Sequence, residues 1–453
     1  MADSPAPAPA TPSRLSFLQS PGAKFVLIGI VAVLLVVPTL LVWGLVEDRA
    51  GRARVVSAEI AQGWGAAQTV NGPWIAIPRE RTVRQGDRTF TERDHVFVSP
   101  ESLNVDATLA VTERRRSIYS TPLYEASVTL DARFARPTAE QLSAFRGLDP
   151  ERATLVVAVS DPSGFASSVE ATLAGSALSM EPGMRDVNVS FQPRRPVPGA
   201  RPSSGIHAPL DLTRLGADTA VRIDMTLRGS KEIVFVPAGQ DTTIGAKGDW
   251  PHPGFQGTFL PASRTVSDGG FEASWSVPYL ARGIAALDAR NLLPSAPSVA
   301  VDLVKPLGFY QLVSRSLKYS VAFIALVFLA TFVLEMLDAR RLHFIQYMLV
   351  GVALVVFYVV LLALAERVGY DLAYLAGALA TTALVAWYIG GALARPRASL
   401  WVGLILAAAY ALIWLILNED EYALLIGAAV AFLAVAATMF ATRKVDWSAQ
   451  GRP

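Results

Sequence analysis

Six runs of about twenty apolar residues, nearly free of charge, constrain this chain more than any other feature. A helix needs roughly twenty apolar residues to cross about 30 Å of hydrocarbon. The runs lie at 25–46, 319–337, 344–365, 372–394, 399–417 and 422–442. Only 17% of the residues are charged, whereas a soluble domain carries about 25%. The sequence therefore predicts a membrane protein with six transmembrane helices.

The first run could be mistaken for a cleavable signal peptide. It is longer than the roughly 7 to 15 residues of a typical signal-peptide core, and no convincing small-residue cleavage site follows closely. Pro38 lies inside the run, and a membrane helix tolerates a proline. We therefore expect the first helix to be retained.

The connections between the runs predict which side of the membrane each part occupies. Basic residues fall on one side if there are six spans; they are Arg14, Lys24, Arg340, Arg341, Arg395, Arg397, Arg443 and Lys444. The positive-inside rule makes that side cytoplasmic. Both termini are then cytoplasmic, and residues 47–317 and the short loop 418–421 lie outside.

The loop at 418–421 reads Asn-Glu-Asp-Glu and contains no positive charge. Several carboxylates are what a hard divalent cation prefers. A four-residue loop, however, cannot easily point Glu419, Asp420 and Glu421 at one centre. The sequence therefore favours a solvated loop that indicates the outer side of the membrane, rather than a metal site.

Residues 47–317 resemble an ordinary secreted domain that is mainly β. Apolar and polar residues alternate at 105–111, 128–134 and 221–227, which is typical of strands with one buried face. Turn signals at 71–73, 161–164 and 268–270 separate such segments. We expect one or two packed antiparallel sheets, because helices do not alternate with strands. Residues 192–202 are the best candidate for an internal linker.

Two short helices are also predicted in this part of the chain. Thr138 and Gln141 have the spacing of a capping box, and Leu142 and Phe145 form the apolar stripe. A second helix at 57–67 would follow the first span as a stalk.

The predicted fold class is a six-helix membrane bundle plus a large mainly-β extracytoplasmic domain, inserted between helices 1 and 2. Residues 1–22 are predicted to be a disordered cytoplasmic tail and 23–46 to be helix 1. The β-rich periplasmic domain covers 47–317, the five-helix region 318–442 and the cytoplasmic carboxyl-terminal tail 443–453.

Several function classes are disfavoured by what the chain lacks. It has no cysteine, so it has neither disulfides nor thiolate metal ligands, and its net charge of +2 does not suggest a nucleic-acid partner. No ionisable residue lies mid-span, which disfavours ion-coupled transport. The nearest case, Glu335, is predicted to pair with Arg340 and Arg341 at the cytoplasmic edge.

Catalysis is also poorly supported. The four histidines, His95, His207, His252 and His343, lack the spacing of a zinc site, and no Gly-x-Ser-x-Gly elbow is present. We predict no catalytic, cofactor-binding or metal-binding residue, so no cofactor and no enzymatic activity. The run Arg114-Arg-Arg116 leaves two interpretations open: contact with phosphate head groups or an anionic polymer, or a strand end whose arginines are solvated or pair with acids of the domain.

Several segments resemble the CreD family of bacterial inner-membrane proteins. They are Arg116-Ser-Ile-Tyr-Ser-Thr-Pro-Leu-Tyr124, Gly205-Ile-His-Ala-Pro-Leu210, Trp250-Pro-His-Pro-Gly-Phe255, Gly257-Thr-Phe-Leu-Pro261, Gly270-Phe-Glu-Ala-Ser-Trp275, Arg315-Ser-Leu-Lys-Tyr319, Leu342-His-Phe-Ile-Gln-Tyr347 and Val445-Asp-Trp447. The match covers about residues 15 to 447. The resemblance implies a multi-pass inner-membrane protein with a periplasmic domain, associated with envelope integrity, tolerance to certain colicins and control by a two-component system.

The family supplies no catalytic residues to carry over. A candidate recognition or structural signature consists of Trp250, Pro251, His252, Pro253, Arg116, Tyr119 and Tyr124. The prolines restrict the backbone and would hold Trp250 and His252 in fixed orientations, either for recognition or simply for packing.

The sequence thus favours a non-enzymatic protein that maintains the envelope, with the lipid bilayer and unknown periplasmic or envelope proteins or cell-wall components as partners and no nucleic acid. The alternative is a component that transports lipid or an envelope precursor. A hydrolase of envelope material is the weakest of the three hypotheses.

Overall fold

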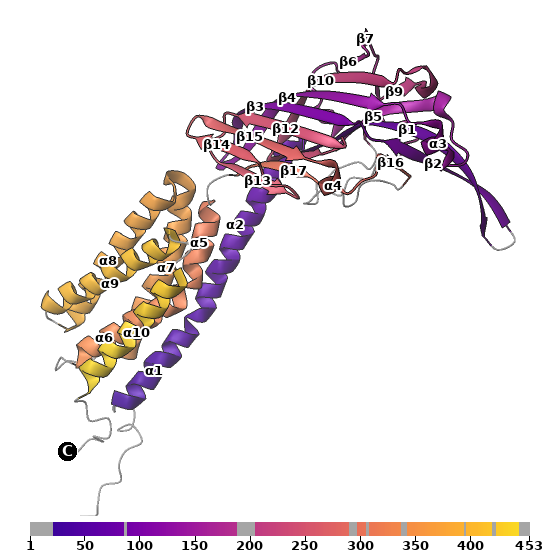
Figure 1. Ribbon diagram of the computed structural model, residues 1–453. Coiled ribbons are helices and arrows are strands. Elements are labelled where there is room, and N and C mark those ends of the chain that lie inside the picture. The colour runs from indigo at the N-terminus through magenta and orange to yellow at the C-terminus, as the bar shows by residue number, and fades with distance from the viewer. Residues whose placement is uncertain are drawn as a thin grey trace, which may run out of the picture. The chain divides into compact units, whose positions relative to one another are not determined.

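The computed structural model describes residues 21–85, 88–187, 204–289, 297–304, 308–336, 342–393, 396–418 and 423–443 (Figure 1). The chain divides into two compact units. The first consists of Met1–Arg52 and Leu307–Pro453, and the second of Ala53–Pro306. We call them the helical unit and the β unit. The predicted tail at 1–22 lies outside the described residues except for Pro21 and Gly22, which begin a helix.

The chain opens with two consecutive helices, α1 (Pro21–Leu34) and α2 (Val36–Gln62). The interruption at Leu35 follows from Pro38, which has no N–H to donate to the carbonyl of Leu34 and whose ring crowds that carbonyl. Together the two helices form one candidate membrane span, Gly22–Gln62. The last turns of α2, from Ala53, belong to the β unit. The predicted stalk helix therefore exists but ends at Gln62 rather than at residue 67.

The helical unit contains six further helices among the described residues: α5 (Phe309–Lys318), α6 (Ser320–Met336), α7 (Phe344–Val368), α8 (Tyr370–Leu393), α9 (Pro396–Asn418) and α10 (Ala423–Thr442). Four candidate spans result from α1–α2, α7, α8 and α9, and a fifth if α5 and α6, bent by 49°, count as one. The apolar stretch of α10, Leu425–Phe440, is shorter. The described residues thus give four or five spans, and six remain a prediction.

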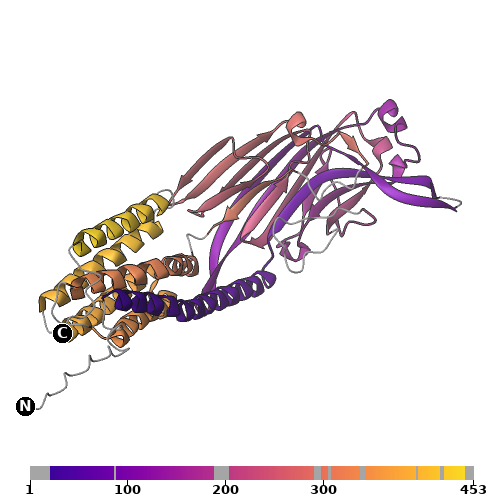
Figure 2. The same ribbon diagram turned by 90° about the horizontal axis from the view of Figure 1, so that it is seen from below.

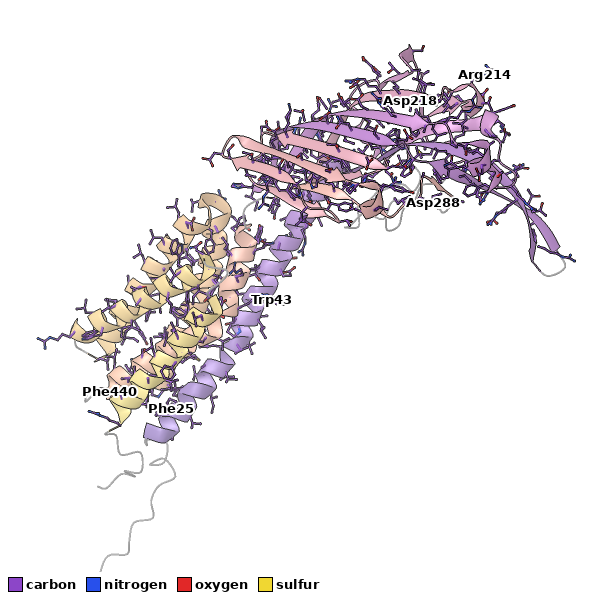
Figure 3. The ribbon with its side chains drawn as sticks, in the orientation of Figure 1. Phe25, Trp43, Arg214, Asp218, Asp288 and Phe440 are labelled. Atoms are coloured by element: carbon purple, nitrogen blue, oxygen red, sulfur yellow. The ribbon has the colours of Figure 1, made fainter. Side chains whose placement is uncertain are left out.

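Large apolar side chains cover the outside of these helices. Figure 3 labels Phe25 on α1, Trp43 on α2 and Phe440 on α10, which are exposed by 47%, 46% and 67%. Inside, one continuous apolar cluster joins residues of α1, α2 and α5 to α9. Apolar surface on both the inside and the outside is typical of helices that lie in a bilayer.

A charged pair is buried at one end of the helical unit. Lys24 of α1 forms an ion pair with Glu335 of α6 and donates a hydrogen bond of 2.5 Å to the carbonyl of Leu342. The Tyr347 hydroxyl donates to the other carboxylate oxygen at 2.8 Å. The structure adds a partner for Glu335 that the sequence did not indicate, because Lys24 lies 311 residues away. Arg340 and Arg341 themselves lie outside the described residues.

The second unit is built from two facing sheets. One follows the order β13 (Pro253–Gly257), β17 (Val299–Leu303), β11 (Glu232–Val236), β1 (Gln68–Gln85), β5 (Ala153–Val159), β9 (Gly205–Leu210), β8 (Glu181–Pro182), with β2 (Arg88–Val98) paired to β1 and β16 (Leu287–Asp288) to β2. The other follows β14 (Ser263–Ser267), β15 (Gly270–Val277), β12 (Asp241–Gly248), β3 (Ser102–Arg116), β4 (Tyr119–Ala135), β10 (Asp218–Ser230), β6 (Glu170–Leu173), β7 (Ser176–Ala177). We call them sheet A and sheet B.

The apolar core lies between the two sheets. The three predicted alternating segments are confirmed as parts of β3, β4 and β10, and their apolar residues are buried except for Val111, which is partly buried. Trp74 from sheet A and Trp275 from sheet B are each 1% exposed. The expectation of purely antiparallel sheets was wrong at two places. β1 pairs with β11, and β12 with β3, in parallel, because each pair is joined by a crossover through other strands rather than by a hairpin.

Of the predicted capping box and turns, some are confirmed by the structure and one is wrong. The capping box of Thr138 and Gln141 is confirmed, and it opens the short helix α3 (Ala139–Ser143). The turns at 161–164 and 268–270 are confirmed by a 3₁₀ turn and by the β14–β15 hairpin. The turn at 71–73 was wrong, because these residues lie inside β1, where its pairing with β5 shifts register. The proposed linker 192–202 lies outside the described residues.

The far ends of β1 and β2 project from sheet A as a two-stranded ribbon (Figure 2). Ion pairs connect its strands: Arg79 with Asp94, Arg81 with Glu92, and Arg93 with Glu80. An isolated two-stranded hairpin is marginally stable in water. The cross-strand ion pairs add a modest stabilisation to this ribbon.

We expect the buried pair Lys24–Glu335 to stabilise the helical unit only as a pair. Lys24→Met leaves a buried carboxylate uncompensated and should cost about 3 kcal/mol, whereas the double variant with Glu335→Gln should recover most of that loss. Thermal unfolding of the full chain in detergent measures both. Arg52→Met is the control, because its ion pair with Asp48 is exposed. Additive losses in the double variant would contradict the coupling.

Candidate functional site

The Trp250–Pro253 segment is the connection by which the chain crosses from sheet B to sheet A. It follows β12, which ends at Gly248, and Pro253 is the first residue of β13. The Trp250 indole N–H donates a hydrogen bond of 3.0 Å to the carbonyl of Val304, just after β17. The Trp250 ring is partly buried against the core, whereas His252 is exposed. The two prolines therefore direct a crossover, and His252 is the exposed residue among positions 250–253.

The second part of the signature lies beside this crossover. The Asp249 carboxylate accepts a hydrogen bond of 2.7 Å from the backbone N–H of Val111 on β3. Val111 is paired directly with Tyr124 on β4. The structure thus connects the residue before Trp250 to the strand pair that carries Tyr124, although 125 residues separate Asp249 from Tyr124 in the sequence.

Arg116 and Tyr119 close the β3–β4 hairpin. They are paired across the two strands, and Ser117 in the turn between them has a φ of 58°. The Arg116 guanidinium pairs with Glu59 of α2 at 2.7 Å, and Arg115 lies 3.9 Å from Glu113. These pairings favour the interpretation in which the arginine run binds acids of its own domain over a free phosphate-binding patch.

Trp64, just after α2, is at the centre of the contacts between this hairpin and the end of the helix. Its ring is flanked by the guanidinium groups of Arg114 and Arg228, 4.9 and 4.6 Å from the ring centroid. Its N–H donates a hydrogen bond of 3.1 Å to the carbonyl of Tyr124. Ser57 of α2 is also hydrogen-bonded to Thr121 of β4 at 2.5 Å. We call this set the helix–sheet joint; it comprises Ser57, Glu59, Trp64, Arg114, Arg116, Thr121, Tyr124 and Arg228.

Tyr124 connects the joint to the core. Its side chain is fully buried, and its hydroxyl donates a hydrogen bond of 2.8 Å to the carbonyl of Glu232. A Cβ on Gly229 would lie 2.3 Å from this hydroxyl, so only glycine fits beside the ring. Burial raises the pKa of the Tyr124 phenol, which keeps it protonated as a donor. Of the signature residues, Tyr124 therefore has a packing role.

Sequence reasoning missed Trp64, Arg228 and Gln68, although all three hold the joint together. The Gln68 amide donates to the carbonyls of Asp161 and Arg228 at 3.0 and 2.9 Å. One sequence feature could have pointed to Trp64: it is an isolated tryptophan at the end of a predicted helix. Arg228 and Gln68 had none, because their partners lie far away in the sequence.

The histidines outside the helical unit do not converge. His95 lies 3.7 Å from Asp186. The His207 Nδ1–H donates a hydrogen bond of 3.1 Å to the carbonyl of Gly183, and the ring lies 3.6 Å from Glu181. Burial lowers the pKa of His95. Across the described ranges, no group of three His, Asp or Glu side chains is placed to hold a metal ion.

Two shallow hollows lie on the outer face of sheet B, of about 440 and 750 Å³. Polar and apolar residues both line them. The first is bordered by Asn104, Asp131, Arg222 and Thr243, and the second by Glu125, Ser127, Lys247 and Glu272. In the first hollow Arg222 is hydrogen-bonded to Asp131 at 3.3 Å and to Asp224 at 2.8 Å. This face offers charged and hydroxyl groups rather than an apolar channel.

Comparison with known proteins gives a family for the chain. Residues 20–448 match the family model described as Inner membrane protein CreD. The chain is 33% identical over 431 residues to Inner membrane protein CreD of Escherichia coli (strain K12), covering 93% of this chain and 92% of that protein. A solved M1 zinc metallopeptidase from Deinococcus radiodurans aligns with 68% of this chain and 94% of its own, at 10% identity and a TM-score of 0.21. That score does not establish a common fold.

We expect Trp64→Leu to destabilise the β unit by about 2–3 kcal/mol, because it removes two stacked guanidinium contacts and one hydrogen bond. Denaturant unfolding of the full chain in detergent measures this. Trp43→Leu is the matched control, since Trp43 is an exposed tryptophan of α2. Equal effects of the two substitutions would show that the joint does not stabilise the unit.

Proposed function

The chain belongs to the CreD family of inner membrane proteins, and from this premise we propose that it maintains cell envelope integrity or serves the envelope stress response. It does so by binding envelope proteins or cell-wall components through the β unit, without catalysing a reaction. The resemblance described from the sequence motifs supports this role. The helices hold the protein in the membrane.

One observation carries this proposal: the β unit has a closed apolar core between its sheets and presents charged and hydroxyl side chains on the outer face of sheet B. The core cluster is formed by residues of both sheets, and the hollows outside it are bordered mainly by charged and hydroxyl side chains. Binding of a polar partner needs such a face. The alternative, in which the unit passes a lipid or envelope precursor to the helices, needs a continuous apolar groove, and the described hollows do not favour it.

The proposal includes a topology. Six spans place both termini in the cytoplasm and the β unit in the periplasm, with the unit inserted between the first and second spans. The basic residues at the connections support this arrangement through the positive-inside rule. Of the loop 418–421, Asn418 ends α9 and residues 419–421 lie outside the described residues, so the support from the loop comes from its sequence alone.

Photocrosslinking in intact cells tests the partner. A photoreactive phenylalanine at Thr243 or Ser127, one in each hollow, should capture periplasmic proteins or cell-wall material. The same group at Arg214, labelled in Figure 3 and outside both hollows, is the control. Equal capture at all three positions would contradict recognition by this face. Turnover of cell-wall substrates by the purified protein would contradict the absence of catalysis.

Thiol labelling tests the sidedness. The chain contains no cysteine, so Asp420→Cys and Arg397→Cys each introduce one reactive thiol. In cells with a permeabilised outer membrane, an impermeant thiol reagent should label Asp420→Cys and leave Arg397→Cys unlabelled. The reverse pattern would invert the topology.

A further inference from the structure

The chain enters the β unit along α2 and leaves it after β17, and both crossings meet at the start of β4. At the entry, the Ser57 hydroxyl of α2 is hydrogen-bonded to the Thr121 hydroxyl at 2.5 Å. At the exit, the Leu303 N–H donates to the Lys231 carbonyl at 2.7 Å, and the Lys231 N–H donates to the Pro122 carbonyl at 3.3 Å. Because α2 also carries part of an apolar span, the start of β4 belongs to the part of the β unit that the chain itself keeps near the membrane.

The β3–β4 hairpin runs along α2 from this point, and its turn points toward the apolar part of the helix. The Trp64 N–H is hydrogen-bonded to the Tyr124 carbonyl, and Ser57 contacts Thr121. The step from Trp64 back to Ser57 covers about 10 Å of helix, and the step from Tyr124 back to Thr121 covers about 10 Å of strand. The two elements therefore advance together, so each residue of β4 nearer the turn lies closer to the apolar part of α2.

The turn extends far enough to reach the lipid headgroups. Ile118 lies three residues beyond Thr121, which is about 10 Å of strand. The same distance from Ser57 along α2 leads to about residue 50, roughly four residues after the uncharged run that ends at Val46. Four residues of helix span about 6 Å, and the headgroup layer on each side of the hydrocarbon is about 5–7 Å deep. The turn is thus level with the headgroups that surround α2.

The turn carries an apolar side chain at a place where polar residues or glycine are usual. Ser117 and Ile118 connect β3 to β4, and Ser117 has a φ of 58°. Tight hairpin turns with a positive φ favour Asn, Asp and Gly. Ile118 is instead a β-branched apolar residue, and its side chain is 38% exposed. Its transfer from water into the apolar edge of a bilayer releases free energy in proportion to the area that leaves water.

The three arginines before the turn point to two faces of the hairpin, because side chains alternate along a strand. Arg114 and Arg116 lie on the face of the helix–sheet joint and are engaged there. Arg115 lies on the opposite face, 3.9 Å from Glu113, and 78% of its side chain is exposed. An exposed ion pair at this distance contributes little to stability. Arg115 is therefore available to an anion outside the β unit.

We propose that the turn of the β3–β4 hairpin docks on the membrane surface, where Ile118 inserts among the lipids and Arg115 binds the phosphate of an anionic phospholipid. A guanidinium group matches a phosphate with two parallel hydrogen bonds, and a basic side chain is attracted to an anionic lipid surface. Arg114 and Arg116 hold the hairpin on α2 while the turn docks. The β unit is then attached to the bilayer at a second point beside α2. This inference concerns the attachment of the β unit and does not depend on the envelope role proposed for it.

The test uses the full-length chain, which contains no cysteine, in vesicles of dioleoylphosphatidylglycerol that include a lipid with a nitroxide on its headgroup. A nitrobenzoxadiazole label is attached at Ile118→Cys or, as the control, at Ala144→Cys. Ala144 is exposed at the end of α3, beyond the far end of β4. The nitroxide should quench the label at position 118 and leave the label at position 144 as bright as in vesicles without nitroxide. Iodide in the water should quench the two labels in the reverse order.

The role of Arg115 is measured in the same vesicles. Fluorescence lifetimes give the ratio of docked to undocked turns for Ile118→Cys alone and together with Arg115→Gln. The ratio should fall about fivefold, because one basic side chain near an anionic surface contributes about 1 kcal/mol. Arg133→Gln is the matched control and should leave the ratio unchanged, since Arg133 is an exposed arginine of β4 that also lies 3.9 Å from an acid, Asp218.

Three results would overturn the proposal. Equal quenching of the two labels by the nitroxide lipid would show that the turn is not at the membrane surface. Protection of the label at position 118 from both nitroxide and iodide would show that protein, rather than lipid, covers the turn. Equal effects of Arg115→Gln and Arg133→Gln would show that Arg115 binds no lipid phosphate. Thermal unfolding checks the fold of each variant; if Ile118→Cys unfolds at a lower temperature, the label is moved to Ser117→Cys, whose side chain is also exposed, and the same outcomes apply.

Discussion

A polar group that is buried away from water costs free energy unless it finds a partner, and this constraint shapes both units of the protein. In the apolar segments, the backbone N–H and C=O groups must form hydrogen bonds within the segment itself, which is why these segments are helical. At the end of the helical unit it holds Lys24, Glu335 and Tyr347 together. In the β unit it directs the Tyr124 hydroxyl to a backbone carbonyl. Among the buried tyrosines of the helical unit, it directs the Tyr374 hydroxyl to the backbone carbonyl of Tyr410.

The signature residues of the family are mainly architectural in this structure. Trp250 fixes the crossover between the sheets, and Arg116 and Tyr124 belong to the helix–sheet joint. His252 alone among the four residues 250–253 is exposed and free to contact a partner. The search for partners therefore moves from the signature to the polar face of sheet B.

Local patterns in the sequence predicted much of the local structure. The period-two segments became β3, β4 and β10, and the Thr138–Gln141 spacing became a capping box. The failures involved long-range context. Asn71-Gly72-Pro73 has the composition of a turn, yet pairing with β5 on one side and β2 further along keeps it within a strand. The pairing of Glu335 with Lys24 was not predicted, because a lysine 311 residues away does not show in the local sequence.

The sequence by itself determined the family, the membrane location and the division into apolar helices and a mainly-β segment. These depend on the length of apolar runs, on their charge and on motifs that are contiguous in the chain. Only the tertiary structure decided which residues meet. Examples are Trp64 between two arginines, Asp249 beside Val111, and the rings of Tyr358, Tyr374 and Tyr410 around Phe357. Such contacts join positions tens or hundreds of residues apart. No local pattern encodes them, because the free energy that selects them comes from packing of the whole chain.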